Sequence, residues 1–347
     1  MTKPLGLAII GVGWAGSRHA EAIRELAAVD KRVEIAAFVD NDADHLQQTA
    51  SKYDVQTTHN TLAAALEDPN VDAIDIATPH ALHEPMTIQA VEAGKHVIVE
   101  KPMAMNVDEA TRMIHAAESN GVRLFVAANQ SYEPYIEFLR QVVETRSPIG
   151  SITTASVAAG FRPRGRYGYP GRREWLAEPN MGGTGSWMLH GIHTIAGVRR
   201  VFGEVTRVYV QEHKTGSFER SDLEGTMTAL VTAESGVNVS VVQSPETRFT
   251  GNTGGYMLHG ESGSIRAGAD SYELLVDGED PSPRLYPPSK LSSYALEFQA
   301  FTDYISGDEL APTTGYSERK TLAVIQAGAE SVDSGNAIDI RERFGRL

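Results

Sequence analysis

The sequence predicts an α/β domain followed by an α+β domain: a Rossmann domain with a doubly wound parallel sheet, then an open, mainly antiparallel sheet with helices on one face. Two observations predict this. Up to residue 128, apolar segments of strand length alternate with helical patterns, as in βαβ units. Beyond it, glycine-bounded segments alternate apolar and polar residues, which suits an antiparallel sheet with one face less buried. We therefore expect domains over 1–128 and 129–347.

The first strand, over residues 5–10, leads into Gly11, Gly13 and Gly16 at G-x-G-x-x-G spacing. Gly11 permits a tight turn, Gly13 lets backbone amides approach a pyrophosphate, and Gly16 lets the next helix lie close to the strand. That helix begins at Trp14 and Ala15, and its positive end points at the anion. A simple helix-capping turn is the alternative.

The end of the second strand, over residues 33–39, supports a dinucleotide site. Asp40 follows it, and a carboxylate there can accept both hydroxyls of an adenosine ribose and repel a 2′-phosphate. Asn41 comes next, and no Lys or Arg follows closely. We therefore expect NAD, with NADP less favoured.

The remaining elements of the first domain continue the alternation, and ligands of such sheets lie at the carboxyl ends of the strands. There we expect Gly11, Asp40, Thr78 and Lys101. The further strands are expected at 54–56, 71–77, 96–99 and 122–127, and the helices at 14–29, 43–52, 62–66, 83–93 and 108–119.

The second domain is expected to start with a helix at 133–144. Its helices at 186–201, 293–306 and 318–334 are expected to cover one face of the sheet. The strands of that sheet are expected at 152–159, 205–212, 225–233, 237–243 and 256–259.

Composition excludes several classes of function. The formal charge of −14 argues against general binding to nucleic acid or anionic membranes. The absence of cysteine excludes disulfides, thiolate metal sites and cysteine nucleophiles. We see no signal-peptide pattern, and no apolar run approaches the ~20 residues that span a bilayer. A cytoplasmic enzyme is expected.

Lys101 is the first candidate for chemistry. It follows a strand end and precedes Pro102, which favours an extended backbone. An ammonium there would hydrogen-bond a substrate hydroxyl near the nicotinamide and stabilise developing negative charge on that oxygen. The alternative is a surface lysine paired to Glu100.

His190 and His193 are the second candidates. On a helix they share the face opposite the apolar stripe that contains Met188 and Ile192. Histidine suits acceptance of a hydroxyl proton near neutral pH. A solvated or structural role is the alternative, and we expect no metal because no carboxylate joins them at matching spacing.

A basic loop with aromatic neighbours is the third candidate. It is suited to bind a carboxylate, a phosphate or a sugar, although a solvated or subunit-contact loop would have the same composition. It contains Arg162, Arg164, Arg166, Arg172 and Arg173, with Tyr167, Tyr169 and Trp175 nearby.

Three segments, 11–16, 77–83 and 94–102, resemble the glucose–fructose oxidoreductase / inositol dehydrogenase / MocA family. The Glu100-Lys101-Pro102 triplet is the most specific match. The resemblance implies an NAD(P)-binding domain, then a domain for substrate binding and oligomerisation. It also implies hydride transfer between a nicotinamide and a sugar or polyol, and it places the family's catalytic lysine on Lys101 and its catalytic histidine on His193.

The sequence departs from the family at two positions. Leu189 stands where an aspartate is frequent, so His190 is the candidate replacement; a frequent arginine after the sixth strand is missing, so Gln130 or Tyr132 is expected to touch ligand. The expected substrate contacts are Lys101, Tyr132, Arg162, Trp175, His190 and His193. The expected cofactor contacts are Gly11, Gly13, Trp14, Ala15, Gly16, Asp40, Asn41, Thr78, Pro79, His83, Glu100, Lys101 and Gln130.

The expected function is NAD-dependent oxidation of a secondary hydroxyl of a sugar, inositol or sugar acid. One alternative is an NAD-using glycosidase that acts by transient oxidation and elimination, and another is a non-catalytic NAD-binding regulator. We expect a homodimer or homotetramer formed through the C-terminal sheet.

Overall fold

Strand order identifies the first sheet of the computed structural model, which describes residues 3–160, 174–182, 185–247, 249, 254–276, 278, 280–307 and 311–347. Its six strands are all parallel and run in the order β3-β2-β1-β4-β5-β6. This is the predicted doubly wound Rossmann sheet. The strands are β1 (Leu5–Ile10), β2 (Val33–Val39), β3 (Thr58–His59), β4 (Ala73–Ile76), β5 (His96–Glu100) and β6 (Leu124–Ala127).

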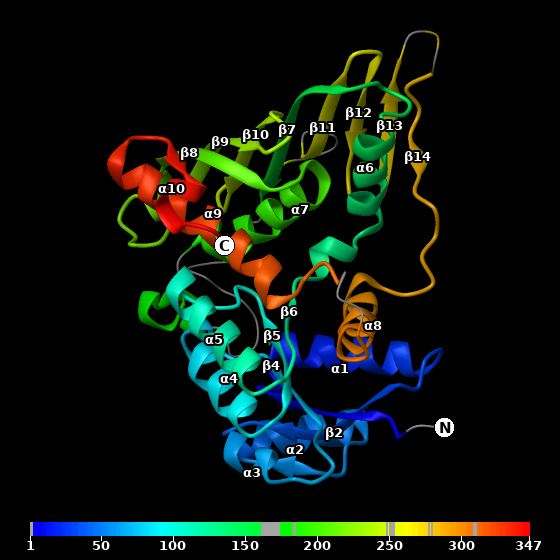
Figure 1. Cartoon of the computed structure of the whole chain (residues 1–347), viewed down its shortest axis with the longest axis vertical. Helices are drawn as coiled ribbons and strands as arrows, with labels where there is room; N and C mark the ends of the chain where they lie inside the picture. Colours follow the sequence, from blue (N-terminus) through cyan, green and yellow to red (C-terminus); the bar gives the residue numbers. More distant parts are fainter. Residues whose placement is uncertain are drawn as a thin grey trace. The chain divides into compact units, whose positions relative to one another are not determined.

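Helices cover both faces of this sheet: α1 lies on one face, and α4 and α5 lie on the other (Figure 1). Polar residues start several of them, as Thr61 does by accepting a hydrogen bond from the Ala64 amide. The helices are α1 (Trp14–Ala27), α2 (Ala43–Tyr53), α3 (Leu62–Leu66), α4 (His83–Glu92) and α5 (Val107–Ser119), with the 3₁₀ turns η1 (His80–Leu82) and η2 (Asn129–Tyr132).

The third strand lies later than predicted. Residues 54–56 are not a strand, because Asp54 ends α2 in the left-handed conformation with φ 55°. The chain straightens only at Thr58–His59, where β3 pairs with β2.

The second sheet has nine strands in the order β14-β13-β12-β11-β7-β10-β9-β8-β15. It is mainly antiparallel, as predicted, and β10 pairs with β7 in parallel. The strands are β7 (Ile152–Gly160), β8 (Val205–His213), β9 (Thr226–Ala233), β10 (Asn238–Ser244), β11 (Gly255–Gly260), β12 (Gly263–Ala267), β13 (Ser271–Leu275), β14 (Arg284–Leu285) and β15 (Ile338–Asp339). The last four were not predicted.

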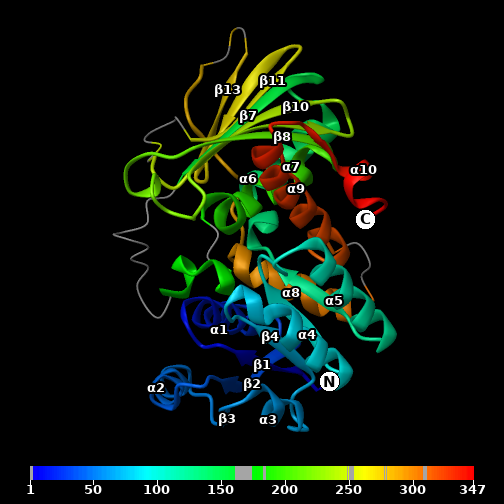
Figure 2. The same cartoon turned by 90° about the vertical axis from the view of Figure 1, so that its left-hand side faces the viewer.

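Figures 1 and 2 show α6 (Pro134–Thr145), α7 (Ile192–Phe202) and α9 (Gly315–Ser334) along one face of this sheet. Along β9, buried and more exposed residues alternate, as expected when one face of a sheet is left open. The remaining elements are the π-helix η5 (Trp187–Gly191), the 3₁₀ turns η3 (Glu174–Ala177), η4 (Pro179–Met181) and η6 (Gly216–Phe218), and the short helix α10 (Ile340–Phe344).

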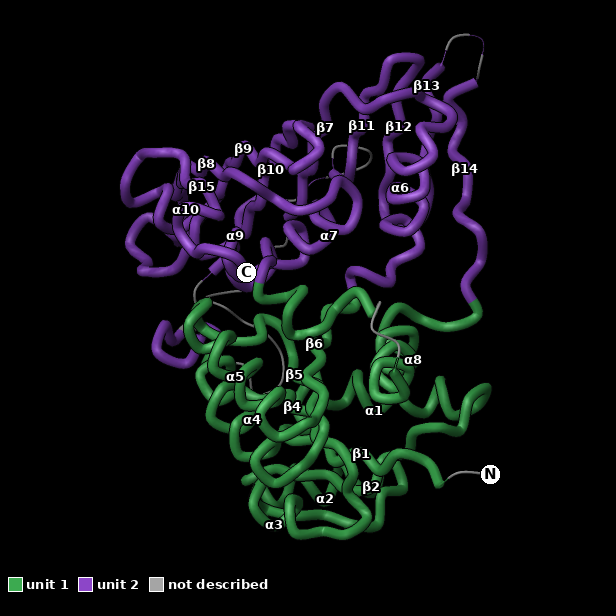
Figure 3. Tube along the Cα trace, in the orientation of Figure 1, with its two compact units in different colours: residues 1–129, 170–175, 290–319 green, residues 130–169, 176–289, 320–347 purple. Residues whose placement is uncertain are grey.

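The chain forms two compact units (Figure 3). Unit 1 comprises residues 1–129, 170–175 and 290–319, and unit 2 comprises 130–169, 176–289 and 320–347. Unit 1 therefore takes in a segment from late in the sequence.

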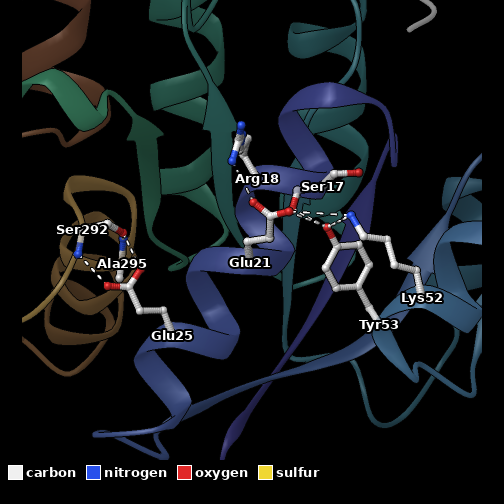
Figure 4. A network of polar contacts seen from close by, with 8 residues as sticks. All are labelled: Ser17, Arg18, Glu21, Glu25, Lys52, Tyr53, Ser292 and Ala295. Atoms are coloured by element: carbon white, nitrogen blue, oxygen red, sulfur yellow. Dashed lines mark hydrogen bonds and ion pairs between the residues drawn. The ribbon is translucent and has the colours of Figure 1, made fainter.

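That late segment carries α8 (Ser293–Ile305), and the expectation that it covers the second sheet was wrong. The helix packs on α1 instead. Glu25 of α1 accepts hydrogen bonds from the Ser292 amide at 2.7 Å and from its hydroxyl at 2.6 Å (Figure 4). The apolar face of α8 buries Phe301, whose ring lies 5.6 Å from that of Phe125 in β6.

In the part of the chain that the structure describes, no helix combines the length and the apolar character needed to cross a membrane.

Candidate active site

The glycine turn after β1 fits a pyrophosphate. Gly11 has φ +87°, and a Cβ on Gly16 would lie 2.1 Å from the Gly11 carbonyl oxygen, so neither position accommodates a side chain. A Cβ on Gly13 would meet no atom within 4 Å, which leaves open space beside the turn. The α1 helix starts at Trp14 with no acidic residue in its first turn and no side-chain cap, so no carboxylate of its own competes with a bound anion there.

Asp40 is held beside this turn. Its Oδ2 accepts a hydrogen bond from the Val12 amide at 3.2 Å, and its Oδ1 accepts one from the Asp42 amide at 3.0 Å. The residue is only 9% exposed, whereas the next residue, Asn41, is exposed. The carboxylate and the glycine turn therefore form one connected surface that fits the adenosine half of a dinucleotide.

His45 belongs to the same surface and was not predicted. Its Nε2 lies 3.0 Å from the carbonyl oxygen of Val12, inside the glycine turn. The only sequence signal was its place in the first turn of the helix after Asp40.

His83 joins the loops that follow β4 and β5. Its Nε2 lies 2.9 Å from the carbonyl oxygen of Thr78, and its Nδ1 lies 2.9 Å from that of Pro102. Burial lowers the pKa of His83, although the two carbonyls and Glu100 oppose the shift. Both ring nitrogens are therefore occupied by main chain, and a contact of His83 with cofactor stays a prediction. Thr78 and Pro79 are half-buried at the end of β4.

Lys101 is half-buried at the end of β5, and its peptide bond to Pro102 is cis. Its main-chain amide donates a hydrogen bond to Glu100 Oε2 at 2.8 Å. Burial lowers the pKa of the Lys101 ammonium, and the adjacent Glu100 carboxylate opposes that shift only in part. The structure thus provides a cation of lowered basicity at the edge of the sheet where the glycine turn and Asp40 lie.

Trp175 lies in unit 1, although it was predicted as a substrate contact of the second domain. Its ring packs edge-on against that of His80, with centroids 4.9 Å apart. Arg162 and the other arginines of the basic loop lie outside the described residues.

Unit 2 carries the two predicted histidines at the start of one long helical segment. His190 lies in the π-helix η5 and His193 in the first turn of α7, and their ring centroids are 6.3 Å apart. Both are half-buried, while Leu189 is buried among apolar residues, as are the stripe residues Met188 and Ile192.

The Glu224 side chain caps the start of this helical segment, and this contact was not predicted. Its Oε2 accepts hydrogen bonds from the main-chain amides of Trp187 at 2.6 Å and Met188 at 3.0 Å. Burial raises the pKa of Glu224 to about 7, against the effect of these two amides. Its role could not be found from the sequence, because the contact links residues that are far apart along the chain.

Gln130 and Tyr132 also belong to unit 2. The Gln130 side-chain amide donates to the hydroxyl of Tyr135, and Tyr132 is half-buried. The structure thus gathers the predicted cofactor residues at one edge of the sheet in unit 1, with the exception of Gln130. The predicted substrate residues Tyr132, His190 and His193 are in unit 2.

A Rossmann sheet with a glycine turn, a buried acid after the second strand and a lysine at one edge is typical of a dinucleotide-dependent oxidoreductase. Comparison with known proteins gives the family. The oxidoreductase family with an NAD-binding Rossmann fold (GFO/IDH/MocA) matches residues 5–128, and the GFO/IDH/MocA C-terminal domain matches residues 138–266. The chain belongs to the GFO/IDH/MocA family of oxidoreductases, as its sequence motifs indicated.

Individual relatives match along the whole chain. The uncharacterized oxidoreductase YrbE of Bacillus subtilis is 25% identical over 350 residues, which is 98% of each protein. D-Apiose dehydrogenase of Paraburkholderia graminis is 27% identical over 96% of this chain and 89% of its own length. The crystal structure of aldose–aldose oxidoreductase from Caulobacter crescentus superposes with a TM-score of 0.83 at 23% identity, over 97% and 99% of the two chains, which shows a shared fold.

Proposed function

We propose that this oxidoreductase acts on a secondary hydroxyl of a sugar, inositol or sugar acid and uses NAD in preference to NADP. A D-apiose dehydrogenase among its relatives supports a sugar substrate. The buried Asp40 carboxylate, fixed by the Val12 and Asp42 amides, supports NAD, because it would repel a 2′-phosphate. A bound nicotinamide would accept hydride from the substrate carbon.

Residues of this chain bind the cofactor and accept the proton of the substrate hydroxyl. The turn from Gly11 through Trp14 and Ala15 to Gly16 binds the pyrophosphate, and Asp40, next to Asn41, binds the ribose. The loops after β4 and β5 bind the nicotinamide half through Thr78, Pro79, His83, Glu100 and Lys101, with Gln130 as a further contact.

The single observation that carries the proposal is the placement of Lys101. Its main-chain amide donates a hydrogen bond to the Glu100 carboxylate at the end of β5, and burial lowers the pKa of its ammonium. Such a cation polarises a substrate hydroxyl and stabilises the negative charge that develops on its oxygen as the hydroxyl proton leaves, before hydride departs from the carbon. We assign acceptance of the hydroxyl proton to His193, with His190 as its orienting neighbour and Tyr132, Arg162 and Trp175 as substrate contacts.

Replacement of Lys101 tests this role. Lys101→Ala should lower kcat by about 1,000-fold and change the Kd for NADH by less than about threefold, because the ammonium acts on the reacting oxygen. Lys31→Ala, at an exposed position before β2, is the matched control. Substrate is found first by a panel of aldoses, inositols and aldonic acids with NAD and NADP, followed by absorbance of the reduced nicotinamide. Equal losses in kcat and NADH affinity would contradict the assignment.

The same panel distinguishes the two alternative functions. Release of sugar from glycosides without net NADH would indicate the glycosidase, and NADH binding without turnover would indicate the regulator.

We also propose a homodimer or homotetramer in the cytoplasm, assembled through the open face of the nine-strand sheet. Leu230 of β9 is 47% exposed among the more exposed residues of that strand, so a substitution there probes this surface. Sedimentation of wild type and Leu230→Asp should give a smaller species for the variant, and a monomeric wild type would contradict the proposal.

A further inference from the structure

Four ionisable side chains from four elements of unit 1 meet in its interior. They are His19 of α1, Asp75 of β4, Glu100 of β5 and Glu297 of α8. His19, Asp75 and Glu297 are fully buried, and the Glu100 side chain is 13% exposed. Only Glu100 has a part in the function proposed above, so the other three buried ionisable side chains need an explanation.

His19 lies at the centre of this cluster. Its Nδ1 lies 2.9 Å and 3.0 Å from the two carboxylate oxygens of Asp75, and its Nε2 lies 3.3 Å from Glu100 Oε1. The 3.3 Å contact between His19 Nε2 and Glu100 Oε1 is an ion pair without an aligned hydrogen bond. The other oxygen of Glu100 accepts the hydrogen bond from the Lys101 amide. A continuous path of contacts therefore runs from Asp75 through His19 and Glu100 to the main chain of Lys101.

The charges along this path follow from their neighbours. Burial lowers the pKa of His19, but Asp75 and then Glu100 outweigh it and raise that pKa well above its usual value. Burial raises the pKa of Glu100, but His19 and then Lys101 outweigh it and lower it. These shifts favour an imidazolium at His19 and a carboxylate at Glu100. His83 of α4 is a further titratable group near Glu100, and burial lowers its pKa against the effect of that carboxylate.

Glu297 closes the cluster from α8. Among the described residues, neither of its carboxyl oxygens has a hydrogen-bond partner, and burial, Glu100 and Asp75 raise its pKa well above its usual value against the effect of His19. Burial also raises the pKa of Asp75 above its usual value, against the effect of the paired His19. The neighbouring Phe298 packs edge-on against the His19 ring at 5.2 Å, which fixes the ring in place.

We propose that His19 is a positioning residue for the reaction: its imidazolium, held by Asp75, keeps Glu100 ionised and directed at the main-chain amide of Lys101. This rests on the role proposed for Lys101. In this proposal Glu297 is a neutral acid that closes the cluster, and among the described residues Asp75 and Glu100 are the carboxylates that form ion pairs with His19.

Two kinetic variants test the path. His19→Gln and Asp75→Asn should each lower kcat by about 100-fold, because a shift of about 1 Å at Lys101 is enough for such a loss, while the Kd for NADH changes by less than about threefold. The double variant should lose no more than the worse single variant, because both act through one path. Glu21→Gln, on the exposed side of the same helix, is the control and should match wild type. Additive losses, or losses in NADH affinity as large as those in kcat, would overturn the proposal.

Two spectroscopic measurements on the protein without substrate separate this proposal from the proposed function. Nitrogen-15 NMR of labelled histidine should show His19 as an imidazolium at about pH 8, and as a neutral ring in Asp75→Asn. Infrared difference spectra between wild type and Glu297→Gln should show a protonated carboxyl at the same pH. A neutral His19 or an ionised Glu297 would overturn the proposal even if the enzyme oxidises sugars. If both signals appear and no sugar is oxidised, the protonation states assigned to His19 and Glu297 are confirmed. The positioning role of His19 and the proposed function are then both contradicted.

Discussion

At the scale of single residues, the glycines of the first turn have different tasks, although the sequence motif treats them alike. Gly16 is required by the fold, since a Cβ would lie 2.1 Å from the Gly11 carbonyl oxygen. Gly13 faces open space. Packing therefore does not require a glycine at this position, and we propose that a bound pyrophosphate does.

This difference predicts opposite outcomes for two alanine variants. Gly16→Ala should lower the free energy of unfolding by about 1–3 kcal/mol because the chain must shift to admit the methyl group. Gly13→Ala should change it by less than about 0.5 kcal/mol and weaken NADH binding at least about tenfold. Thermal unfolding and titration of NADH fluorescence measure the two quantities. Unchanged NADH affinity in Gly13→Ala would show that the pyrophosphate does not lie on this turn.

The site residues whose positions could be predicted are those placed by near neighbours in the sequence, while their roles stay predictions. Asp40 and Lys101 each follow a buried strand, and parallel strands bring such positions to one edge. His45, Glu224 and the buried contact of Glu297 were missed for the opposite reason. Their partners are distant in the sequence, and nothing in the local pattern marks them.

At the scale of elements, α8 shows why a helix can be predicted while its partner is not. Its apolar pattern was clear, but an apolar face packs equally well on a sheet or on another helix. The choice comes from specific contacts such as that between Glu25 and Ser292 (Figure 4).

Loss of this contact should loosen α8. Glu25→Ala removes the acceptor of two hydrogen bonds at the helix start and should lower the free energy of unfolding by about 1 kcal/mol. Glu92→Ala, at an exposed position of α4, is the control and should have almost no effect. Chemical denaturation of the two variants measures the difference, and equal stabilities would contradict the role of Glu25.

Glu224, which caps the helical segment with His190 and His193, should make the free energy of unfolding depend on pH. Because the pKa of Glu224 is about 7 in the folded protein and about 4.3 in an unfolded chain, the folded state holds the proton more tightly. Stability should therefore fall as pH rises from about 4 to about 7, by about 3 kcal/mol from this group.

Glu224→Gln keeps an oxygen acceptor for the Trp187 and Met188 amides but cannot ionise. Denaturation at a series of pH values should show a flatter profile for this variant than for wild type. Parallel profiles would contradict the assigned titration.

At the scale of the whole molecule, both sheets and their order along the chain were predicted, because periodicity distinguishes buried parallel strands from half-exposed antiparallel ones. The sequence did not predict that residues 290–319 return to unit 1. Family membership also shows at this scale, because the matches to the GFO/IDH/MocA oxidoreductases cover residues 5–128 and 138–266.

We propose that hydride passes directly from a sugar carbon to NAD with the help of Lys101. The most direct measurement uses the substrate selected by the panel, with deuterium at the carbon to be oxidised, and mass spectrometry of the nicotinamide product. We predict singly deuterated NADH from wild type and from Lys31→Ala, at a rate reduced about 1,000-fold in Lys101→Ala. NADH without deuterium, or equal rates for Lys101→Ala and wild type, would contradict the account.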